Sequence, residues 1–303
     1  MHEVEVVIAG AGSIGLLLGS YFCEADMNVT FLVRSDAQKE SLKKDGLRRI
    51  NMDRSEIECP VDAILKIEEA PVNALWILAV KYAGLKELLK ELDKAEMKNP
   101  VLFVQNGIGH IELAQHSQLP TIGLATVEHG ALRIDNRTVQ HNGSGTISIA
   151  PFRGDNSTFQ LLHSAQTTAF PITYVNDAEQ SLLRKVLLNC IINPLTTILH
   201  LKNGELLSNP YAYNLLVKLH KELLHAFPEM NTSLTLEAVE KVCEKTAANH
   251  SSMLVDRLNG NRMEIETIVS AVILKADSKD CKLPTLEMLE QMLLALDWRD
   301  EKV

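Results

Sequence analysis

The amino-acid sequence predicts an α/β protein with a doubly wound parallel sheet in its first part and an all-α second part. In the first half, apolar strand-like runs alternate with amphipathic helical patterns. Such βαβ alternation builds a parallel sheet with helices on both faces. After about residue 175 the patterns are helical throughout. We therefore expect two domains, covering residues 1–175 and 176–303.

Periodicity and turn signals place the individual elements. The strands expected in the first half cover residues 4–9, 28–33, 74–80 and 101–104, and the helices cover 13–25, 83–94 and 109–116. Two short strands at 138–141 and 146–149 flank the Gly-rich run 142–145, which predicts a hairpin and an antiparallel edge on the sheet. Helices of the second domain are expected at 178–199, 210–226, 234–249, 263–276 and 284–298.

Composition and charge exclude several classes of protein. The net charge of −9 argues against a nucleic-acid-binding protein, whose surface is usually basic. No apolar run reaches membrane-spanning length, and the first residues lack the layout of a secretion signal. The five cysteines are scattered and form no C-x-x-C pair, so we expect free thiols in the cytoplasm and neither disulfides nor a metal site.

A glycine-rich turn follows the first strand directly. The run Gly10–Gly15 reads G-x-G-x-x-G and leads into the first helix, which is the context of a Rossmann-like dinucleotide fingerprint. Gly10 permits the tight turn, Gly12 allows the backbone to approach a pyrophosphate, and Gly15 allows close packing of helix on strand. The residues predicted to bind the cofactor here are Gly10, Ala11, Gly12, Ser13, Ile14 and Gly15. The first domain is therefore predicted to bind a dinucleotide.

The end of the second strand indicates which dinucleotide is bound. An NAD enzyme usually has an acidic residue here for the ribose 2′-hydroxyl, whereas NADP is met by a cation. Residues 33–35 include no acid, and Arg34 offers a planar, bidentate phosphate partner. NADP(H) is the predicted cofactor.

A polar stripe interrupts the apolar helix predicted for residues 178–199. Lys185, Asn189 and Asn193 are four residues apart, so they lie on one helix face. Buried ammonium and amide groups cost free energy unless a polar neighbour or ligand satisfies them. Pro194 removes a backbone donor and disfavours helical geometry at the preceding residue. The stripe is either an internally satisfied polar patch or a ligand site.

In combination these motifs resemble the ketopantoate reductase (2-dehydropantoate 2-reductase) family over nearly the whole chain. The matching motifs, in order, are Gly10–Gly15, Leu32–Arg34, Ala79–Lys81, Gln105–Gly109, Lys185–Pro194, Ser251–Leu254 and Arg262–Ile265. The resemblance implies reduction of ketopantoate to pantoate with NADPH, an early step toward coenzyme A. It also implies that Lys81 and Asn106 contact the cofactor, and that the active site lies in the cleft between the domains.

The resemblance assigns roles that agree with the chemistry of the residues. Lys185 would donate the proton to the carbonyl oxygen, because desolvation lowers the pKa of a lysine toward neutrality. Glu264 would accept from a substrate hydroxyl and hold the lysine. The residues expected to bind a small 2-oxo acid are Asn106, Asn189, Asn193 and Ser252. The expected partners are this acid, neither nucleic acid nor a membrane, and a second copy of the chain if a homodimer forms.

Three positions depart from the family pattern: Glu266 stands for an aspartate, Ser270 for a glycine and Leu286 for an asparagine. They leave open another 2-oxo-acid reductase or a β-hydroxyacid dehydrogenase. A non-catalytic NADP(H)-sensing protein is a third hypothesis, which an intact lysine stripe disfavours.

Other catalytic schemes find little support in the sequence. A histidine acid would have to come from residues such as His110, His129 or His141, none of which has a motif that fixes a partner acid. A Ser/His/Asp hydrolase would need a G-x-S-x-G elbow between a strand and a helix, and none occurs.

Overall fold

The computed structural model describes residues 4–155 and 157–298, and contacts divide the chain into two compact units. The first unit comprises Met1–Gln105 and Ile111–Ser181, and the second comprises Asn106–His110 and Leu182–Val303. The observed division follows Ser181, on the first turn of the helix that begins at Ala178, and so lies six residues beyond the expected boundary at 175. The short segment 106–110, expected in the nucleotide domain, packs instead with the helical unit.

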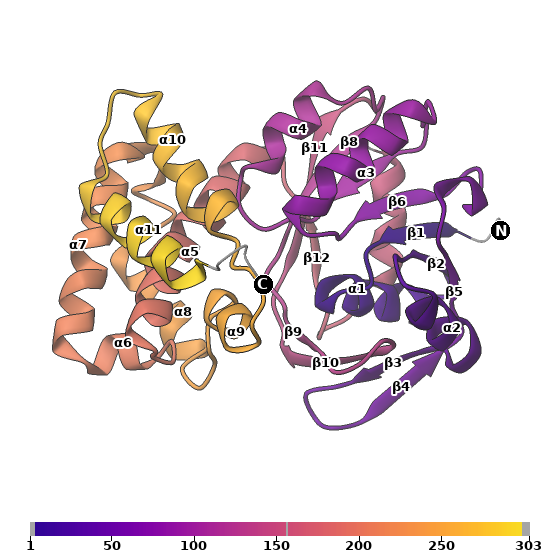
Figure 1. Ribbon diagram of the computed structural model, residues 1–303, viewed down its shortest axis with the longest axis horizontal. Coiled ribbons are helices and arrows are strands. Elements are labelled where there is room, and N and C mark those ends of the chain that lie inside the picture. Colours follow the sequence, from indigo (N-terminus) through magenta and orange to yellow (C-terminus); the bar gives the residue numbers. More distant parts are fainter. Residues whose placement is uncertain (1–3, 156, 299–303) are drawn as a thin grey trace. The chain divides into compact units, whose positions relative to one another are not determined.

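An eight-stranded sheet forms the centre of the first unit, in the order β12-β11-β8-β7-β6-β1-β2-β5 (Figure 1). Its strands are β1 (Glu5–Ala9), β2 (Asn28–Leu32), β5 (Asp62–Ile64), β6 (Leu75–Leu78), β7 (Val101–Phe103), β8 (Ile122–Val127), β11 (Ile147–Arg153) and β12 (Ile172–Tyr174). The pairs from β5 to β8 are parallel, while β11 runs antiparallel to β8. The Rossmann-like parallel sheet and its antiparallel edge are confirmed. Strands β1, β6 and β7 are fully buried apart from Glu5, as expected for a sheet covered on both faces.

A second sheet of four strands lies beyond helix α1 (Ser13–Glu24), in the order β4-β3-β10-β9. Its strands are β3 (Leu47–Ile50), β4 (Glu56–Cys59), β9 (Gly130–Arg133) and β10 (Thr138–Gly143). Helix α1 contacts strands of both sheets, and eight of its twelve residues are buried. Gly19 permits this, because a methyl group there would lie 2.4 Å from Cζ of Phe31. The helix that begins at the glycine-rich turn is thus held on two sides.

The predicted hairpin of residues 138–149 is wrong. Strand β10 pairs with β3 and β9, whereas β11 pairs with β8 and β12 in the other sheet. The connection crosses between sheets, and a methyl group on Gly145 would lie 2.2 Å from the carbonyl oxygen of Glu128. The glycine here serves a close backbone approach and not a two-strand turn. The small sheet escaped prediction because its strands β3 and β4 are short and carry charged residues.

The remaining elements of the first unit are helical. They are α2 (Asp36–Asp45), α3 (Tyr82–Lys94), α4 (His110–His116) and the 3₁₀ turns η1 (Ile67–Glu69) and η2 (Ser157–Ala165). Figure 1 shows α3 and α4 on one face of the large sheet and α1 on the other. Helix α2 was not among the expected elements, because only Gln38 and Leu42 of its ten residues are buried.

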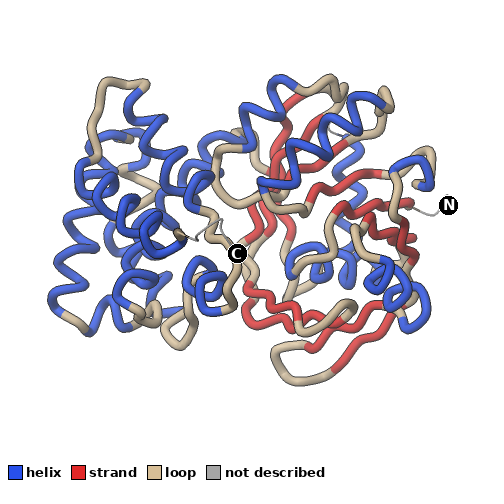
Figure 2. Tube along the Cα trace, viewed as in Figure 1, coloured by secondary structure: helices blue, strands red, loops and turns tan. Residues whose placement is uncertain are grey.

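Among the residues that the structure describes in the second unit, the regular elements are all helices, joined by loops (Figure 2). Its elements are α5 (Ala178–Leu199), α6 (Glu205–Ser208), α7 (Pro210–Ala226), η3 (Pro228–Met230), α8 (Leu236–Lys245), α9 (Ser252–Leu258), η4 (Glu266–Ser270), α10 (Ala271–Asp277) and α11 (Pro284–Asp297). Helix α5 is long and apolar enough to cross a membrane, but 67% of its apolar window is buried inside the protein. It is the core helix of this unit.

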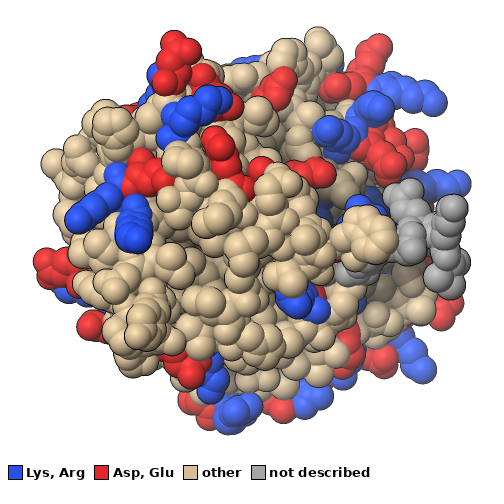
Figure 3. Space-filling view, turned by 60° about the vertical axis from the view of Figure 1, so that its left-hand side comes forward, with Lys and Arg blue, Asp and Glu red and all other residues tan. Residues whose placement is uncertain are grey.

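One detail of the second unit differs from the expected pattern. The helix expected at 263–276 begins with η4, a π-helical turn, before it continues as α10. The helix expected at 178–199 is confirmed, since α5 covers Ala178–Leu199 with Pro194 inside it. On the face that Figure 3 shows, Lys and Arg side chains alternate with Asp and Glu around a broad uncharged area, unlike the continuous basic surface of a nucleic-acid-binding protein.

Candidate active site

The glycine-rich turn of the first unit is shaped by close backbone contacts. Gly10 has φ of 105°, and a methyl group there would lie 2.9 Å from the amide nitrogen of Val80. At Gly15 a methyl group would lie 1.9 Å from the carbonyl oxygen of Gly10. Larger residues cannot occupy these positions without moving the main chain. The turn is therefore pressed between β1, α1 and the end of β6.

Gly12, by contrast, faces open space: no atom lies within 4 Å of a methyl group built on it. It is the N-cap of α1, and no side chain caps the helix amides there. Exposed amides at a helix N-terminus, with the positive end of the helix dipole, bind phosphate groups. The turn is held from the side by Gln38, whose Nε2 donates to the carbonyl oxygen of Ala11 at 2.9 Å. These residues fit the pyrophosphate of a dinucleotide.

Arg34 lies beside the start of α3. A methyl group on Gly84 would lie 2.2 Å from Nη2 of Arg34, so the guanidinium rests on the first turn of that helix. Lys81 is the N-cap of α3 and is exposed. The cationic side chains of Arg34 and Lys81 thus both lie near the start of α3, which follows strand β6. They can meet a phosphate that the acidic chain as a whole would repel.

In the second unit, the polar stripe on α5 has a partner in the segment 106–110. Nζ of Lys185 donates to Oδ1 of Asn106 at 2.8 Å. Lys185 and Asn189 are partly buried and Asn193 is buried, so the stripe becomes less accessible along the helix. The amide nitrogen Nδ2 of Asn193 has no hydrogen-bond partner among the residues that the structure describes. A buried donor without a partner costs about 1–3 kcal/mol, which a polar ligand can recover.

The π-helical turn η4 holds the segment that carries Asn106. A π-helix forms wider hydrogen-bonded rings than an α-helix and occurs often at functional sites. The carbonyl oxygen of Thr267 accepts from the backbone amide of Ile108 at 3.1 Å. Gly107 has φ of 81°, and a methyl group there would lie 2.0 Å from the same carbonyl oxygen. The next carbonyl, of Ile268, accepts from Sγ of Cys190 on α5 at 3.3 Å.

His110 is fully buried near Lys185. Burial, together with the charge of Lys185, lowers the pKa of His110 to about 4. Its imidazole is therefore neutral at neutral pH and poorly suited to deliver a proton.

Ser251 and Ser252 occupy different environments at the start of α9. Ser251 is buried and caps the helix, since its Oγ accepts from the amide of Leu254 at 3.3 Å. Ser252 is the first helical residue and is exposed, so its hydroxyl is accessible to a ligand. Glu264 is partly buried and immediately precedes the turn that leads into η4. The expected substrate residues Asn189, Asn193, Ser252 and Glu264 thus all belong to the second unit, together with Asn106 and Lys185.

His129 and His141 belong to a buried network in the first unit. Nδ1 of His141 lies 2.9 Å from Oη of Tyr21, and its Nε2 lies 3.1 Å from Nδ1 of His129. Phe170 stacks on both His129 and Tyr21. This network packs against Tyr21 of α1, so we assign the two histidines a structural role.

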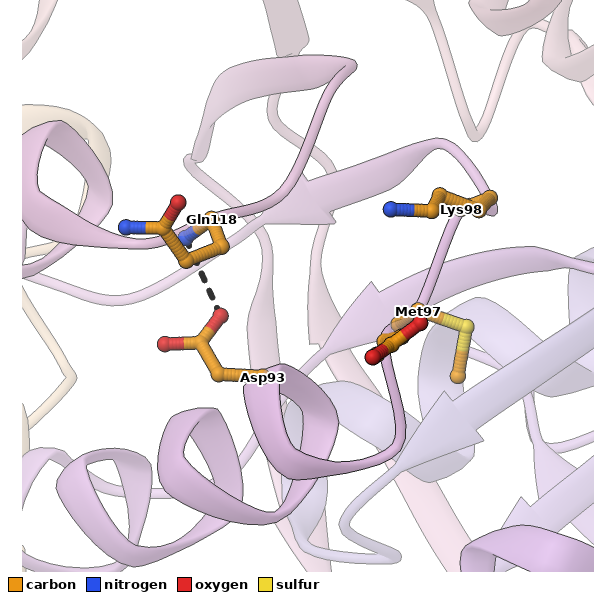
Figure 4. Close-up of a pocket in the computed structure, with 5 residues that line it drawn as sticks. Asp93, Met97, Lys98 and Gln118 are labelled. Atoms are coloured by element: carbon orange, nitrogen blue, oxygen red, sulfur yellow. Dashed lines mark hydrogen bonds between the residues drawn. The ribbon is translucent and has the colours of Figure 1, made fainter.

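Two hollows on the surface of the first unit lie at the amino ends of the parallel strands, opposite to the end where a dinucleotide would bind. One, of about 230 Å³, is lined by Asp93, Met97, Lys98 and Gln118, and Asp93 there accepts from the amide of Gln118 (Figure 4). Another, of about 640 Å³, includes Trp76 and Pro100 at the starts of β6 and β7. Ligands of doubly wound sheets bind beyond the carboxyl ends of the strands. We assign neither hollow to the active site.

Comparison with known proteins agrees with both halves of this description. The family described as "Ketopantoate reductase PanE/ApbA" matches residues 6–154, and its C-terminal counterpart matches residues 177–297. This chain belongs to the ketopantoate reductase family. A 2-dehydropantoate 2-reductase of Listeria innocua is 35% identical over 300 residues, which is 98% of each chain.

Solved structures extend the comparison to the fold. A probable 2-dehydropantoate 2-reductase from Bacillus subtilis is similar with a TM-score of 0.86 and 30% identity, covering 97% of this chain and 100% of that one. A D-mandelate dehydrogenase solved with NADH and anilino(oxo)acetate has a TM-score of 0.83 at 21% identity, covering 97% of this chain and 98% of that one. At this identity the second likeness concerns the fold alone.

The three departures from the ketopantoate reductase pattern have structural explanations of different strength. Leu286 is fully buried in the core at the start of α11. Ser270 donates to the Glu290 carboxylate, which ties η4 to α11. Glu266 is exposed at the start of η4, and nothing in the structure explains the longer side chain.

Sequence reasoning missed residues whose role lies in supporting the site. Gln38 holds the glycine-rich turn. The main-chain carbonyl of Thr267 docks the segment of Asn106, and that of Ile268 binds the thiol of Cys190 on α5. No side-chain signal marks a main-chain acceptor. The position of Gly107 in the run Gln105–Gly109 was the one available sign of a close backbone approach.

Proposed function

We propose that this protein reduces 2-dehydropantoate (ketopantoate) to pantoate with NADPH. The observation that carries the proposal is the hydrogen bond from Lys185 to Asn106 within the polar stripe of an otherwise apolar helix. It places the ammonium group of Lys185 against a neutral amide acceptor. Family membership supports the same reaction.

Lys185 acts as the general acid. When a hydride adds to the carbonyl carbon of a 2-oxo acid, negative charge develops on the carbonyl oxygen, and a positioned donor there accelerates the reaction. Asn106 accepts one of the three ammonium protons of Lys185. Neutral His110 adds no competing positive charge beside the lysine.

The other polar residues of the second unit orient the substrate. Asn189 and Asn193 donate amide N–H groups to its hydroxyl or carboxylate oxygens, and the partnerless Nδ2 of Asn193 is one such donor. Ser252 donates to the carboxylate. Glu264 accepts from the substrate hydroxyl, which distinguishes ketopantoate from 2-oxo acids that lack one. Such hydrogen bonds position the carbonyl carbon for attack.

We further propose that the glycine-rich turn, Arg34 and Lys81, all in the first unit, bind NADP(H), and that Asn106 contacts the cofactor. The nicotinamide supplies the hydride when the cofactor is bound. The uncapped start of α1 receives the pyrophosphate, and Arg34 receives the 2′-phosphate. The NADH in the D-mandelate dehydrogenase structure belongs to that protein and shows that this fold also accommodates the other nicotinamide.

A steady-state assay tests the proposal directly. The purified protein is offered NADPH or NADH with ketopantoate, 2-oxoisovalerate, pyruvate or benzoylformate, and oxidation of the cofactor is followed. We expect the highest kcat/KM for ketopantoate with NADPH. A clear preference for benzoylformate or 2-oxoisovalerate would assign the protein to another 2-oxo-acid reductase, and no turnover with any acid would favour the sensor hypothesis.

A further inference from the structure

Two buried hydroxyl groups connect α5 to the start of α9. Oγ1 of Thr196 lies 2.8 Å from Oγ of Ser251, and the two residues are 0% and 4% exposed. Thr196 is three residues beyond Asn193, just past Pro194 on α5. Ser251 precedes Ser252 and caps α9. The contact therefore joins the two elements that carry the proposed substrate residues.

Thr196 is the donor at this junction. Its Oγ1 donates to Oγ of Ser251 at 2.8 Å, and the carbonyl oxygens of Ile192 and Asn193 lie 2.8 Å and 3.1 Å from the same atom. A hydroxyl has one proton, so these three acceptors share it. Oγ of Ser251 also accepts from the amide of Leu254. The contacts therefore form an unbroken chain from the backbone of α5 to the first turn of α9.

The chain ends beside the proline in α5. Ile192 and Asn193 form the turn next to Pro194, where the helix lacks one amide donor. The hydroxyl of Thr196 offers the carbonyl oxygen of Ile192, four residues earlier, an additional donor, a contact that often bends a helix. Because its other contact is the cap of α9, the same hydroxyl holds that helix start in register with the turn of Asn193.

We propose that Thr196 is a positioning residue for substrate binding, which acts through Ser251 and sets the exposed hydroxyl of Ser252 relative to Asn193. The proposal rests on the proposed function. Thr196 itself is fully buried. Ser252 binds the carboxylate and not the carbonyl oxygen on which negative charge develops. Its displacement should remove binding that is equal in the ground and transition states, which raises KM and leaves kcat nearly unchanged.

The test compares variants that remove one link with a control that removes a similar cap elsewhere. Thr196→Val deletes the hydroxyl at nearly constant shape, Ser251→Ala deletes the next link, and Thr196→Ser restores a hydroxyl. Thr235→Ala is the matched control, because Oγ1 of Thr235 caps α8 by accepting from the amide of Ala238 at 3.2 Å. KM and kcat are measured for ketopantoate and for NADPH, and exchange of the Leu254 amide is followed by mass spectrometry or NMR.

We expect Thr196→Val and Ser251→Ala to raise KM for ketopantoate by about tenfold to a hundredfold, the range for an ångström-scale misplacement. KM for NADPH should stay the same, Thr196→Ser should be close to the unmodified protein, and Thr235→Ala should show unchanged KM values. Faster exchange at Leu254 in the first two variants would report the broken chain. If Thr196→Val does not fold, Ser251→Ala carries the same comparison.

Two results would overturn the inference while the proposed function stands. One is normal KM for ketopantoate in folded Thr196→Val and Ser251→Ala proteins; the other is an equal rise of KM in Thr235→Ala. A lack of turnover by the unmodified protein is a different failure, since it overturns the proposed function and the positioning role with it.

Discussion

The glycine-rich turn of the first unit and the polar stripe of the second present their functional groups in different ways. The turn offers backbone amides, and its shape depends on glycines that allow contacts too close for a side chain, as at Gly15. The stripe on α5 offers an ammonium and amide groups on a helix whose backbone is otherwise regular. Substitutions in the turn should therefore act by steric exclusion, and those in the stripe by loss of a chemical group.

The largest effect should come from removing the ammonium of the stripe. Lys185→Ala should lower turnover by roughly 10²–10⁴, the usual contribution of general acid catalysis. Cofactor binding should change little, because Lys185 belongs to the second unit and the glycine-rich turn to the first. Lys185→Arg should not restore turnover, since a guanidinium does not release its proton near neutral pH. Kinetics, cofactor titration and thermal unfolding separate these effects; a folded alanine variant with near-normal turnover would refute the mechanism.

Within the turn, two glycines should separate folding from cofactor binding. Gly15→Ala should lower the free energy of unfolding by about 3 kcal/mol, because its methyl group meets the backbone of Gly10. Gly12→Ala meets no atom within 4 Å and should fold normally. It should nevertheless weaken NADPH binding about tenfold to a hundredfold by keeping the phosphate from an amide. Urea unfolding and cofactor titration measure the pair, and tight NADPH binding by Gly12→Ala would place the phosphates elsewhere.

The second region should be sensitive to acid through His110. The pKa of this histidine is about 4 in the folded protein and about 6.5 when unfolded, so the unfolded state binds the proton more readily. Above pH 6.5 His110 costs no stability; between pH 6.5 and 4 its contribution should fall by up to about 3 kcal/mol. His110→Gln should flatten this part of the curve. His116→Gln, at an exposed position on the same helix, is the control; identical curves for both variants would contradict the prediction.

The smallest effect concerns the one charged side chain that we assign to the 2′-phosphate. Arg34→Ala should weaken NADPH binding by about 1.5–3 kcal/mol, the value of a charge-assisted hydrogen bond, and leave NADH binding nearly unchanged. Arg54→Ala, which removes an exposed arginine of the same unit, should affect neither cofactor. Equal losses for the two cofactors in Arg34→Ala would show that this guanidinium does not read the 2′-phosphate.

Sequence patterns predicted the features of this protein that depend on neighbouring residues. The strand, turn and helix around Gly10–Gly15 and the length of α5 follow from local periodicity, and both are present. The hairpin at residues 138–149 failed, because the choice of strand partners is made by the tertiary structure. The small sheet was missed because its strands β3 and β4 are short and carry charged residues.

The candidate site shows the same limit. Sequence motifs picked out Lys185 and Asn106 separately, but their hydrogen bond joins residues 79 positions apart in the chain. The contact of Thr196 with Ser251 spans 55 positions. No spacing rule foretells such pairs. The roles assigned to the site residues stay predictions until the variants are measured.

The π-helical turn at Glu266–Ser270 has a consequence for how freely this site can vary. Its two outward carbonyls, of Thr267 and Ile268, receive the segment of Asn106 and the thiol of Cys190. A carbonyl is the same in every residue, so the docking does not read the identity of these side chains. The restriction falls on Gly107 alone, where any methyl group would strike the turn. A library randomised among apolar residues at 267 and 268 should yield many active proteins, and one randomised at 107 should return glycine.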